Sequence, residues 1–230
     1  MKYILILACI VFTGCGSLTE QITPENDERE VPRTIHISVP FSPQAPFANW
    51  DDPYQEACEE MSLIMVHHFL AGTPLSREDA DRELLALIAW EEEHGYPQDV
   101  TITQLADIAE DYYGYRTNNV FTEVRVETMK EELAAGNPII VPAAGRDLGN
   151  PYFSGEGPWY HMLVITGYDA RRFITNDPGT RRGEGFSYKY ATLLNAIHDW
   201  TGVKEDIRTG VQKMLIIEND SAPLQPSSAG

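Results

Sequence analysis

The chain has 230 residues, of which 35 are acidic and 17 are basic, so its formal charge at pH 7 is −18. This excess of negative charge argues against nucleic acid and anionic lipid head groups as electrostatic partners, because both are polyanions. The length is sufficient for one domain with a sizeable hydrophobic core. Otherwise the acidity predicts a well-solvated surface.

The N-terminus has the layout of an export signal. Met1–Tyr3 carries a positive charge, and residues 4–12 form an apolar run that is too short to span a membrane as a helix. The small residues that precede Cys15 resemble a bacterial lipoprotein signal. This resemblance implies cleavage before Cys15, a lipid on that residue, and anchoring in the bacterial cell envelope outside the cytoplasm. An ordinary secretory leader, cut nearby, has the same layout and is the alternative.

Composition divides the chain into segments. An acidic, polar stretch follows the leader, a domain with patterned apolar residues comes next, and the end is rich in Ser, Pro and Ala. We therefore expect a signal peptide at 1–14, a flexible tether at 15–33, one domain at 34–219 and a disordered tail at 220–230.

The first half of the domain is predicted to be mainly helical. Thr34–Val39 alternates apolar and polar residues, as in a short strand, and prolines then exclude regular structure up to Phe47. Typical helix-starting and helix-ending residues bracket the segments that follow. We expect helices at 57–70, at 77–94 with Ser76 as its N-cap, from 101 or 103 to 112, and at 127–135. In the second helix, the residues expected to face the core are Leu84, Leu85, Leu87 and Ile88.

The second half consists of short apolar segments separated by turns. They predict strands at 138–142, 159–168, 172–176, 186–190 and 212–218, with a helix at about 192–200. Helices first and a mostly antiparallel sheet afterwards is the pattern of the α+β class.

Cys58 lies in the first turn of the helix predicted at 57–70. Backbone N–H groups are unpaired there and the helix dipole is positive, which favours a thiolate. The dipole contributes about 0.3–1 kcal/mol, whereas one pKa unit corresponds to about 1.4 kcal/mol, so the dipole alone cannot maintain a thiolate at neutral pH. Glu59 and Glu60 raise the thiol pKa further. A nucleophilic Cys58 therefore requires a histidine partner, and without one it is a buried, inert cysteine.

The cysteine count favours a reactive Cys58. Cys9 is lost with the predicted leader and Cys15 is lipidated, which leaves Cys58 as the free thiol. A lone cysteine that has no partner for a disulfide, in an exported protein, is a candidate nucleophile.

His161 is the histidine that best fits the partner role. It starts a strongly apolar strand directly after a glycine-rich loop, and such junctions often carry functional residues. The next predicted strand ends at Asp177, so a hairpin of the two strands brings this carboxylate to His161, where it can accept the Nδ1–H. The alternatives are a turn role for Asp177 and a packing role for His161.

The sequence predicts no metal and no cofactor. His67 and His68 are adjacent, so they point about 100° apart on a helix and cannot chelate one ion together. A single free cysteine provides no thiolate cluster either.

Segments in this order along the chain resemble the C39-like cysteine peptidases of the papain-like superfamily. The residues that carry the resemblance are Val39–Gln44, Cys58–Ser62, Gly136–Val141, His161–Asp169 and Asn176–Pro178. The resemblance implies a papain-like fold, with a helical lobe that carries the nucleophile and an antiparallel sheet lobe that carries the histidine and the aspartate.

The resemblance also implies a role for each site residue. Cys58 would be the nucleophile, His161 the general base and then the acid, and Asp177 the group that orients the imidazole. The oxyanion hole would use the Cys58 N–H and the side chain of Gln44, with Gln55 as the alternative because it is closer to Cys58 in the sequence. Glu59 stands where transporter-linked relatives have glycine, so their double-glycine specificity does not carry over.

The sequence therefore predicts an exported, lipid-anchored cysteine peptidase or amidohydrolase that cleaves peptide or isopeptide bonds through an acyl-enzyme. Its partners would be a peptide or protein substrate, and the membrane through the lipid on Cys15, but not nucleic acid. The alternative is a catalytically inactive lipoprotein of the same fold that serves as a binding or structural module of the envelope. The sequence does not indicate an oligomeric state.

Overall fold

The structure, a computed structural model, describes residues 31–116 and 118–218. The predicted signal peptide, Cys15, most of the predicted tether and the predicted tail lie outside the described residues. The described residues belong to one compact unit, which the division of the chain places from Val31 onward. Within them, no helix is both long enough and apolar enough to cross a membrane.

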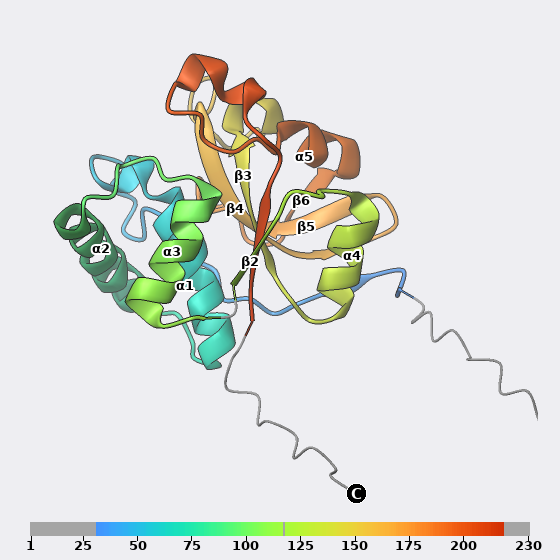
Figure 1. Cartoon of the computed structure of the whole chain (residues 1–230), viewed down its shortest axis with the longest axis horizontal. Coiled ribbons are helices and arrows are strands. Elements are labelled where there is room, and N and C mark those ends of the chain that lie inside the picture. Colours follow the sequence, from blue (N-terminus) through green and yellow to red (C-terminus); the bar gives the residue numbers. More distant parts are fainter. Residues whose placement is uncertain (1–30, 117, 219–230) are drawn as a thin grey trace, which may run out of the picture. The chain divides into compact units, whose positions relative to one another are not determined.

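An antiparallel sheet forms the centre of the fold (Figure 1). Its strand order is β2-β7-β3-β4-β5-β6, and the short β1 pairs with β4 outside this path. All nine residues of β4 are buried, and β4 carries His161. The strands are β1 Ile35–His36, β2 Asn118–Phe121, β3 Ile139–Ala144, β4 Tyr160–Tyr168, β5 Arg172–Asn176, β6 Phe186–Lys189 and β7 Met214–Ile217.

Three helices gather beside the sheet and form the helical lobe (Figure 1). These are α1 (Cys58–Ala71), α2 (Arg77–His94) and α3 (Ile102–Tyr113). Helix α1 contacts β4, α2 and α3, so it lies between the sheet and the other two helices. Helix α4 (Val126–Ala134) contacts β3 and β4, and α5 (Tyr190–Ala196) contacts β5 and β6. Short 3-10 helices are η1 Tyr54–Glu56, η2 Gly145–Leu148 and η3 Lys204–Thr209.

Helix α1 is held by burial on almost all sides. Its apolar residues cover most of its circumference, and residues 61–66 are 0–1% exposed. Each fully buried Leu, Ile or Met side chain contributes roughly 1.5–3 kcal/mol, so this helix is fixed firmly against the sheet. It ends at Gly72, whose φ of 65° lies in the left-handed region that glycine adopts without strain. The first residue of this rigid helix is Cys58.

The predicted α+β class is confirmed, and the predicted elements lie in the expected order, with β2 between α3 and α4 as an additional strand that was not predicted. Helix α3 begins after Thr101, which forms a full capping box with Gln104. Leu85 is an exception to the predicted core, because it is 40% exposed whereas Leu84 and Leu87 are fully buried. The helix predicted at 192–200 lies earlier, at α5, and the strand predicted at 34–39 is reduced to β1.

Candidate active site

Cys58 is the first residue of α1, directly after Ala57, which has no side chain that could cap the helix. Among the described residues it is the free cysteine. Its Sγ accepts a hydrogen bond from the backbone N–H of Met162 at 3.3 Å. Because Met162 follows His161 in β4, this contact places the sulfur directly against the strand that carries the predicted base.

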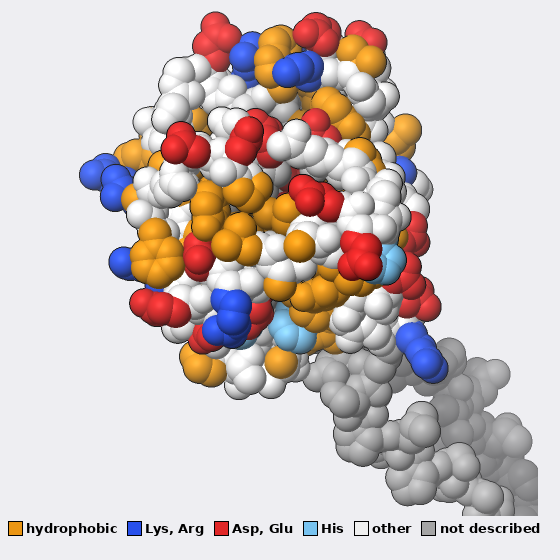
Figure 2. Space-filling model, turned by 90° about the vertical axis from the view of Figure 1, so that its left-hand side faces the viewer, with side chains coloured by type: hydrophobic (Ala, Val, Ile, Leu, Met, Phe, Trp, Pro, Cys, Tyr) orange, Lys and Arg blue, Asp and Glu red, His pale blue; other side chains and the backbone are white. Residues whose placement is uncertain are grey.

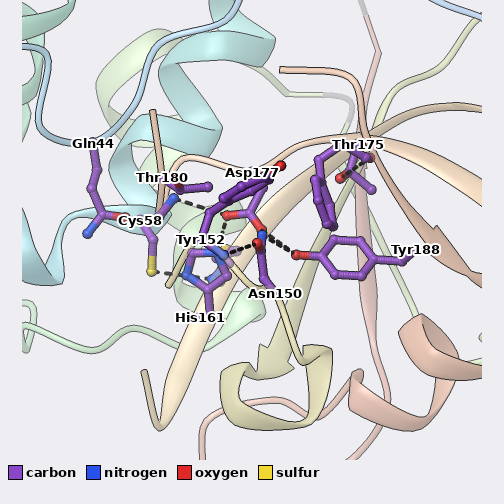
Figure 3. Close-up of polar contacts among 12 residues, drawn as sticks. Gln44, Cys58, Asn150, Tyr152, His161, Thr175, Asp177, Thr180 and Tyr188 are labelled. Carbon is purple, nitrogen blue, oxygen red and sulfur yellow. Dashed lines mark hydrogen bonds and ion pairs between the residues drawn. The ribbon is translucent and has the colours of Figure 1, made fainter. Parts of the chain in front are cut away.

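His161 and Asp177 form a close, buried pair, with 2.8 Å between His161 Nε2 and Asp177 Oδ1. His161 lies in β4, and Asp177 directly follows β5, the antiparallel neighbour of β4 in which Asn176 lies opposite Val164. Both side chains are almost inaccessible to solvent. In Figure 3 the imidazole lies between the Cys58 sulfur and the Asp177 carboxylate.

The ring nitrogen that bonds Asp177 differs from the prediction. From the sequence we expected His161 to donate its Nδ1–H to Asp177, whereas in the structure it donates its Nε2–H. The hairpin register fixes where Asp177 lies, but the rotation of the imidazole follows from the packing around it. Nδ1 is therefore the ring nitrogen that does not bond Asp177.

Asp177 is held by donors on every side. Its Oδ2 accepts hydrogen bonds from Asn150 Nδ2 at 3.1 Å and from the Tyr188 hydroxyl at 2.5 Å, and its Oδ1 also accepts the Gly179 N–H at 3.0 Å (Figure 3). Burial acts to raise the pKa of Asp177, but the interaction with His161 and the hydrogen bonds from His161, Tyr188 and Asn150 outweigh burial and lower the pKa. The carboxylate is therefore ionised and fixed in orientation, as a group that orients a base requires.

Two glycines leave room for the imidazole. A Cβ on Gly179 would lie 2.8 Å from His161 Cε1 and 3.2 Å from Nε2, and a Cβ on Gly145 would lie 3.0 Å from His161 Cβ. The Phe153 ring packs edge-on against the imidazole, with 5.2 Å between the ring centroids. The position of the ring thus depends on these close neighbours as well as on Asp177.

The thiol hydrogen-bonds directly to Glu59, the neighbour that was expected from the sequence to raise its pKa. Cys58 Sγ lies 3.0 Å from Glu59 Oε2, and Glu59 is 1% exposed. Burial, followed by the negative charge of Glu59, raises the pKa of Cys58 well above that of an ordinary thiol. In this conformation the cysteine is a neutral thiol that donates its hydrogen bond to Glu59, so it must redirect that proton before it can act as a nucleophile.

Glu59 belongs to a buried group of carboxyls. Burial raises the pKa of Glu59, with a further increase from Glu60. Burial likewise raises the pKa of Glu60 to about 7. In Glu91 on α2, burial and the charge of Glu60 raise the pKa to about 11, so Glu91 is protonated at neutral pH and hydrogen-bonds Glu60. Helical periodicity does not predict this burial, because charged residues in a first turn are commonly solvated.

The two glutamines proposed for the oxyanion hole lie in different surroundings. Gln44 is 3% exposed, and its Nε2 donates to the carbonyls of Tyr54 at 2.8 Å and Gln55 at 2.9 Å. Both amide hydrogens are then in use, and Gln44 would have to release one to bind an oxyanion. Gln55 is exposed, and its Nε2 donates to Asp52 Oδ1 at 2.7 Å.

One pocket of about 430 Å³ joins these groups. Its lining includes Cys58, His161, Gln44 and Gln55, together with Tyr160, the first residue of β4, and Trp159, which precedes it. The loop that leads into β4 also contributes, through Phe153 and Gly157. The sequence alone did not distinguish whether these residues border a cleft or only pack in the core. The pocket brings together a thiol, an oriented imidazole and hydrogen-bond donors, which are the groups required for nucleophilic attack on a carbonyl group.

Asn150 and Tyr188 were not predicted from the sequence as partners of Asp177. Asn150 lies in the loop after η2 and Tyr188 in β6, and neither is near Asp177 in the sequence. Within the described residues, no group of three or more His, Cys, Asp or Glu side chains has an arrangement suited to a metal ion.

Comparisons with known proteins identify the family and a similar fold. Residues 36–205 match the sequence profile of the Peptidase_C39 like family. The fold is similar to the crystal structure of a candidate C39-like peptidase from Bacillus anthracis, with a TM-score of 0.54 at 15% identity. That match covers 81% of this chain and 98% of the other. No functionally curated protein matches the chain. The extent of the profile match shows that the chain belongs to the Peptidase_C39 like family.

Proposed function

We propose that this protein is an exported, lipid-anchored cysteine peptidase or amidohydrolase that cleaves peptide or isopeptide bonds. The observation that carries the proposal is the arrangement of Cys58, His161 and Asp177. His161 Nε2 lies 2.8 Å from the buried Asp177 carboxylate. Cys58 Sγ lies 3.3 Å from the backbone nitrogen of Met162, the residue that follows His161. Membership of a peptidase-like family supports the same reaction class. Export and the lipid on Cys15 rest on the N-terminal sequence.

The proposed reaction begins when His161 Nδ1 takes the thiol proton of Cys58. The sulfur attacks the substrate carbonyl carbon, and the resulting oxyanion accepts hydrogen bonds from the Cys58 N–H and a glutamine amide. The C–N bond breaks, the amine leaves with the proton from His161, and a thioester remains. His161 then takes a proton from water, which attacks the thioester and releases the acid and the free thiol.

The resting hydrogen bond from Cys58 to Glu59 fits this sequence as a state that precedes the reaction. A substrate carbonyl in the pocket would favour transfer of the thiol proton to His161, because the negative charge that develops is then matched by the oxyanion donors. Asp177 remains ionised throughout, since its lowered pKa keeps it charged beside an imidazolium.

The test is the pH dependence of Cys58 alkylation by iodoacetamide in a chain that starts at Ser17. Labelling that is lost or strongly slowed in His161→Ala, together with hydrolysis of a peptide library by the unmodified chain, supports the peptidase. Labelling that follows an ordinary buried thiol, is unchanged in His161→Ala and is accompanied by no hydrolysis would leave the alternative, a binding or structural lipoprotein of this fold.

A further inference from the structure

Carboxylates are concentrated at one part of the pocket beside Cys58. Glu56, Glu59 and Asp99 all line it. Neither Glu56 nor Asp99 forms a hydrogen bond or an ion pair with another side chain in the described part of the chain. Desolvation raises the pKa of Glu56, and the negative charge of Asp99 raises it further, so the two carboxylates are close enough to repel each other.

Two further acceptors in the same lining are deeply buried and have no donor. These are Glu59 Oε1 and Gln44 Oε1, on side chains that are 1% and 3% exposed. A buried acceptor without a partner costs about 1–3 kcal/mol, so such atoms usually serve a ligand or a water molecule. Gln44 and Cys58 line the same pocket, and both are labelled in Figure 3.

Three tryptophans also line the pocket. These are Trp50, Trp159 and Trp200, and tryptophan faces attract cations. One such contact already exists at this wall, because the Arg146 guanidinium lies 3.6 Å from the centroid of Trp159. Acidic side chains are also spread over the face of the molecule that Figure 2 shows, and the whole chain carries a charge of −18.

Lys204 is the cation within the lining that could satisfy these groups. It begins η3 at an exposed position. Its charge lowers the pKa of Asp99, but burial dominates and the pKa stays raised. Lys204 therefore compensates only part of the negative charge of Glu56 and Asp99, and it makes no ion pair with either of them.

We infer that this pocket binds a cationic group of the substrate, the ammonium or guanidinium of a peptide, beside the bond that Cys58 attacks. This inference rests on the proposed function, since it names the substrate class for the same site. The positive group would lie among Glu56, Asp99 and the tryptophan faces, and its N–H donors would reach the acceptors that have no partner. The pocket would therefore prefer peptides with Lys or Arg next to the scissile bond.

Acyloxymethyl ketone probes with the same reactive group test the inference, because Cys58 attacks each of them and expels the same carboxylate. The acetylated probes carry lysine, norleucine or glutamate, so that lysine and norleucine differ mainly in charge. A fourth probe has norleucine with a free α-amine, which separates a terminal amine from a side chain. The readout is the second-order rate of Cys58 labelling, followed by mass spectrometry of the chain from Ser17.

We expect the acetyl-lysine probe to react about tenfold faster than acetyl-norleucine, and acetyl-glutamate to react more slowly. In the double variant Glu56→Gln/Asp99→Asn the ratio of the lysine rate to the norleucine rate should fall below about twofold. The matched control is Asp111→Asn/Glu131→Gln, which removes the same charge from exposed positions outside the pocket and should retain the preference. Faster labelling by the free-amine probe would support the cation site and assign it to a terminal amine.

The outcomes separate the two proposals. Rapid norleucine labelling that depends on His161, with no lysine preference, would overturn the cationic site and leave the peptidase intact. A lysine preference that falls equally in the control double variant would overturn it too, because the effect would then come from overall charge. Slow labelling by every probe, unchanged in His161→Ala, would instead overturn the proposed function.

Discussion

The thiol of Cys58 donates its hydrogen bond to the carboxylate of the next residue, with 3.0 Å between Cys58 Sγ and Glu59 Oε2. This contact opposes the effect of the helix N-terminus on the thiol pKa, because the dipole favours a thiolate whereas an adjacent buried carboxylate disfavours one. The dipole is worth at most about 2 kcal/mol. Burial and Glu59 together therefore determine the resting state, and the pKa of Cys58 is raised.

Replacement of this carboxylate should make the cysteine more reactive. In Glu59→Gln the side chain that accepts the thiol hydrogen bond can no longer carry a negative charge, and we expect the apparent thiol pKa to fall by about one unit or more. Alkylation by iodoacetamide at pH 7 should be correspondingly faster. The measurement is the labelling rate from pH 5 to 10, with Glu92→Gln on the exposed face of α2 as the matched control. An unchanged or upward-shifted profile in Glu59→Gln would show that the carboxylate does not govern the thiol.

Asp177 should matter through its oxygen acceptor as well as its charge. Asp177→Ala removes the partner of His161 Nε2 and the carboxylate that accepts from Asn150 and Tyr188, so we expect labelling and hydrolysis to fall by about 10²–10⁴-fold. Asp177→Asn retains an oxygen that can accept the Nε2–H and should retain more activity. Measurement of both rates, with thermal unfolding of each variant, tests this order. Equal activity of Asp177→Ala and the original chain would remove Asp177 from the site.

Much of this site could be predicted from the order of helices and strands along the chain. The contacts between distant segments could not. The apolar run that ends at Gly72 predicts α1 and places Cys58 at its start. Consecutive strands joined by a tight turn predict that Asp177 meets His161, since antiparallel neighbours bring their ends together. The rotation of the imidazole could not be predicted in the same way, because it depends on side chains packed around the ring.

The features that the sequence did not predict share a physical cause. Asn150 and Tyr188 reach Asp177 from a loop and from β6, and no local pattern marks either of them. Strand β2 has only four residues, none of them fully buried, and pairs with the distant β7, so its periodicity is too short to recognise. The burial of Glu59 is a tertiary effect that helical propensity does not register.

A methyl group at position 179 should displace the imidazole without disturbing the fold. In Gly179→Ala the new Cβ would lie 2.8 Å from His161 Cε1 and 2.9 Å from the Phe153 ring, closer than side chains tolerate. We expect at least about a tenfold loss of the His161-dependent labelling rate, because a small misplacement of a catalytic group is costly. The thermal midpoint should fall by only a few degrees, as expected for about 1 kcal/mol. Full reactivity in this variant would mean that the ring can occupy another position.

The buried carboxyls on α1 and α2 should make the protein less stable as the pH rises. Burial and the charge of Glu60 raise the pKa of Glu91 to about 11, and burial raises that of Glu60 to about 7. Unfolded glutamate titrates near ~4.3, so above that pH the folded chain binds more protons than the unfolded chain and the free energy of unfolding decreases with pH. The contribution is fully present below about pH 4.3 and declines from there toward pH 7 and above.

Glu91→Gln tests this because an amide retains a hydrogen-bond donor for Glu60 and needs no proton. We expect the variant to be more stable than the original chain at pH 8 by about 1–2 kcal/mol, which is a few degrees in the thermal midpoint, and the difference to shrink toward pH 5. Thermal unfolding at the two pH values measures it. Glu92→Gln, on the exposed side of the same helix turn, should leave the pH dependence unchanged. A variant that is less stable than the original chain at pH 8 would contradict this, because it would show that Glu91 is ionised in the folded protein and does not donate a proton to Glu60.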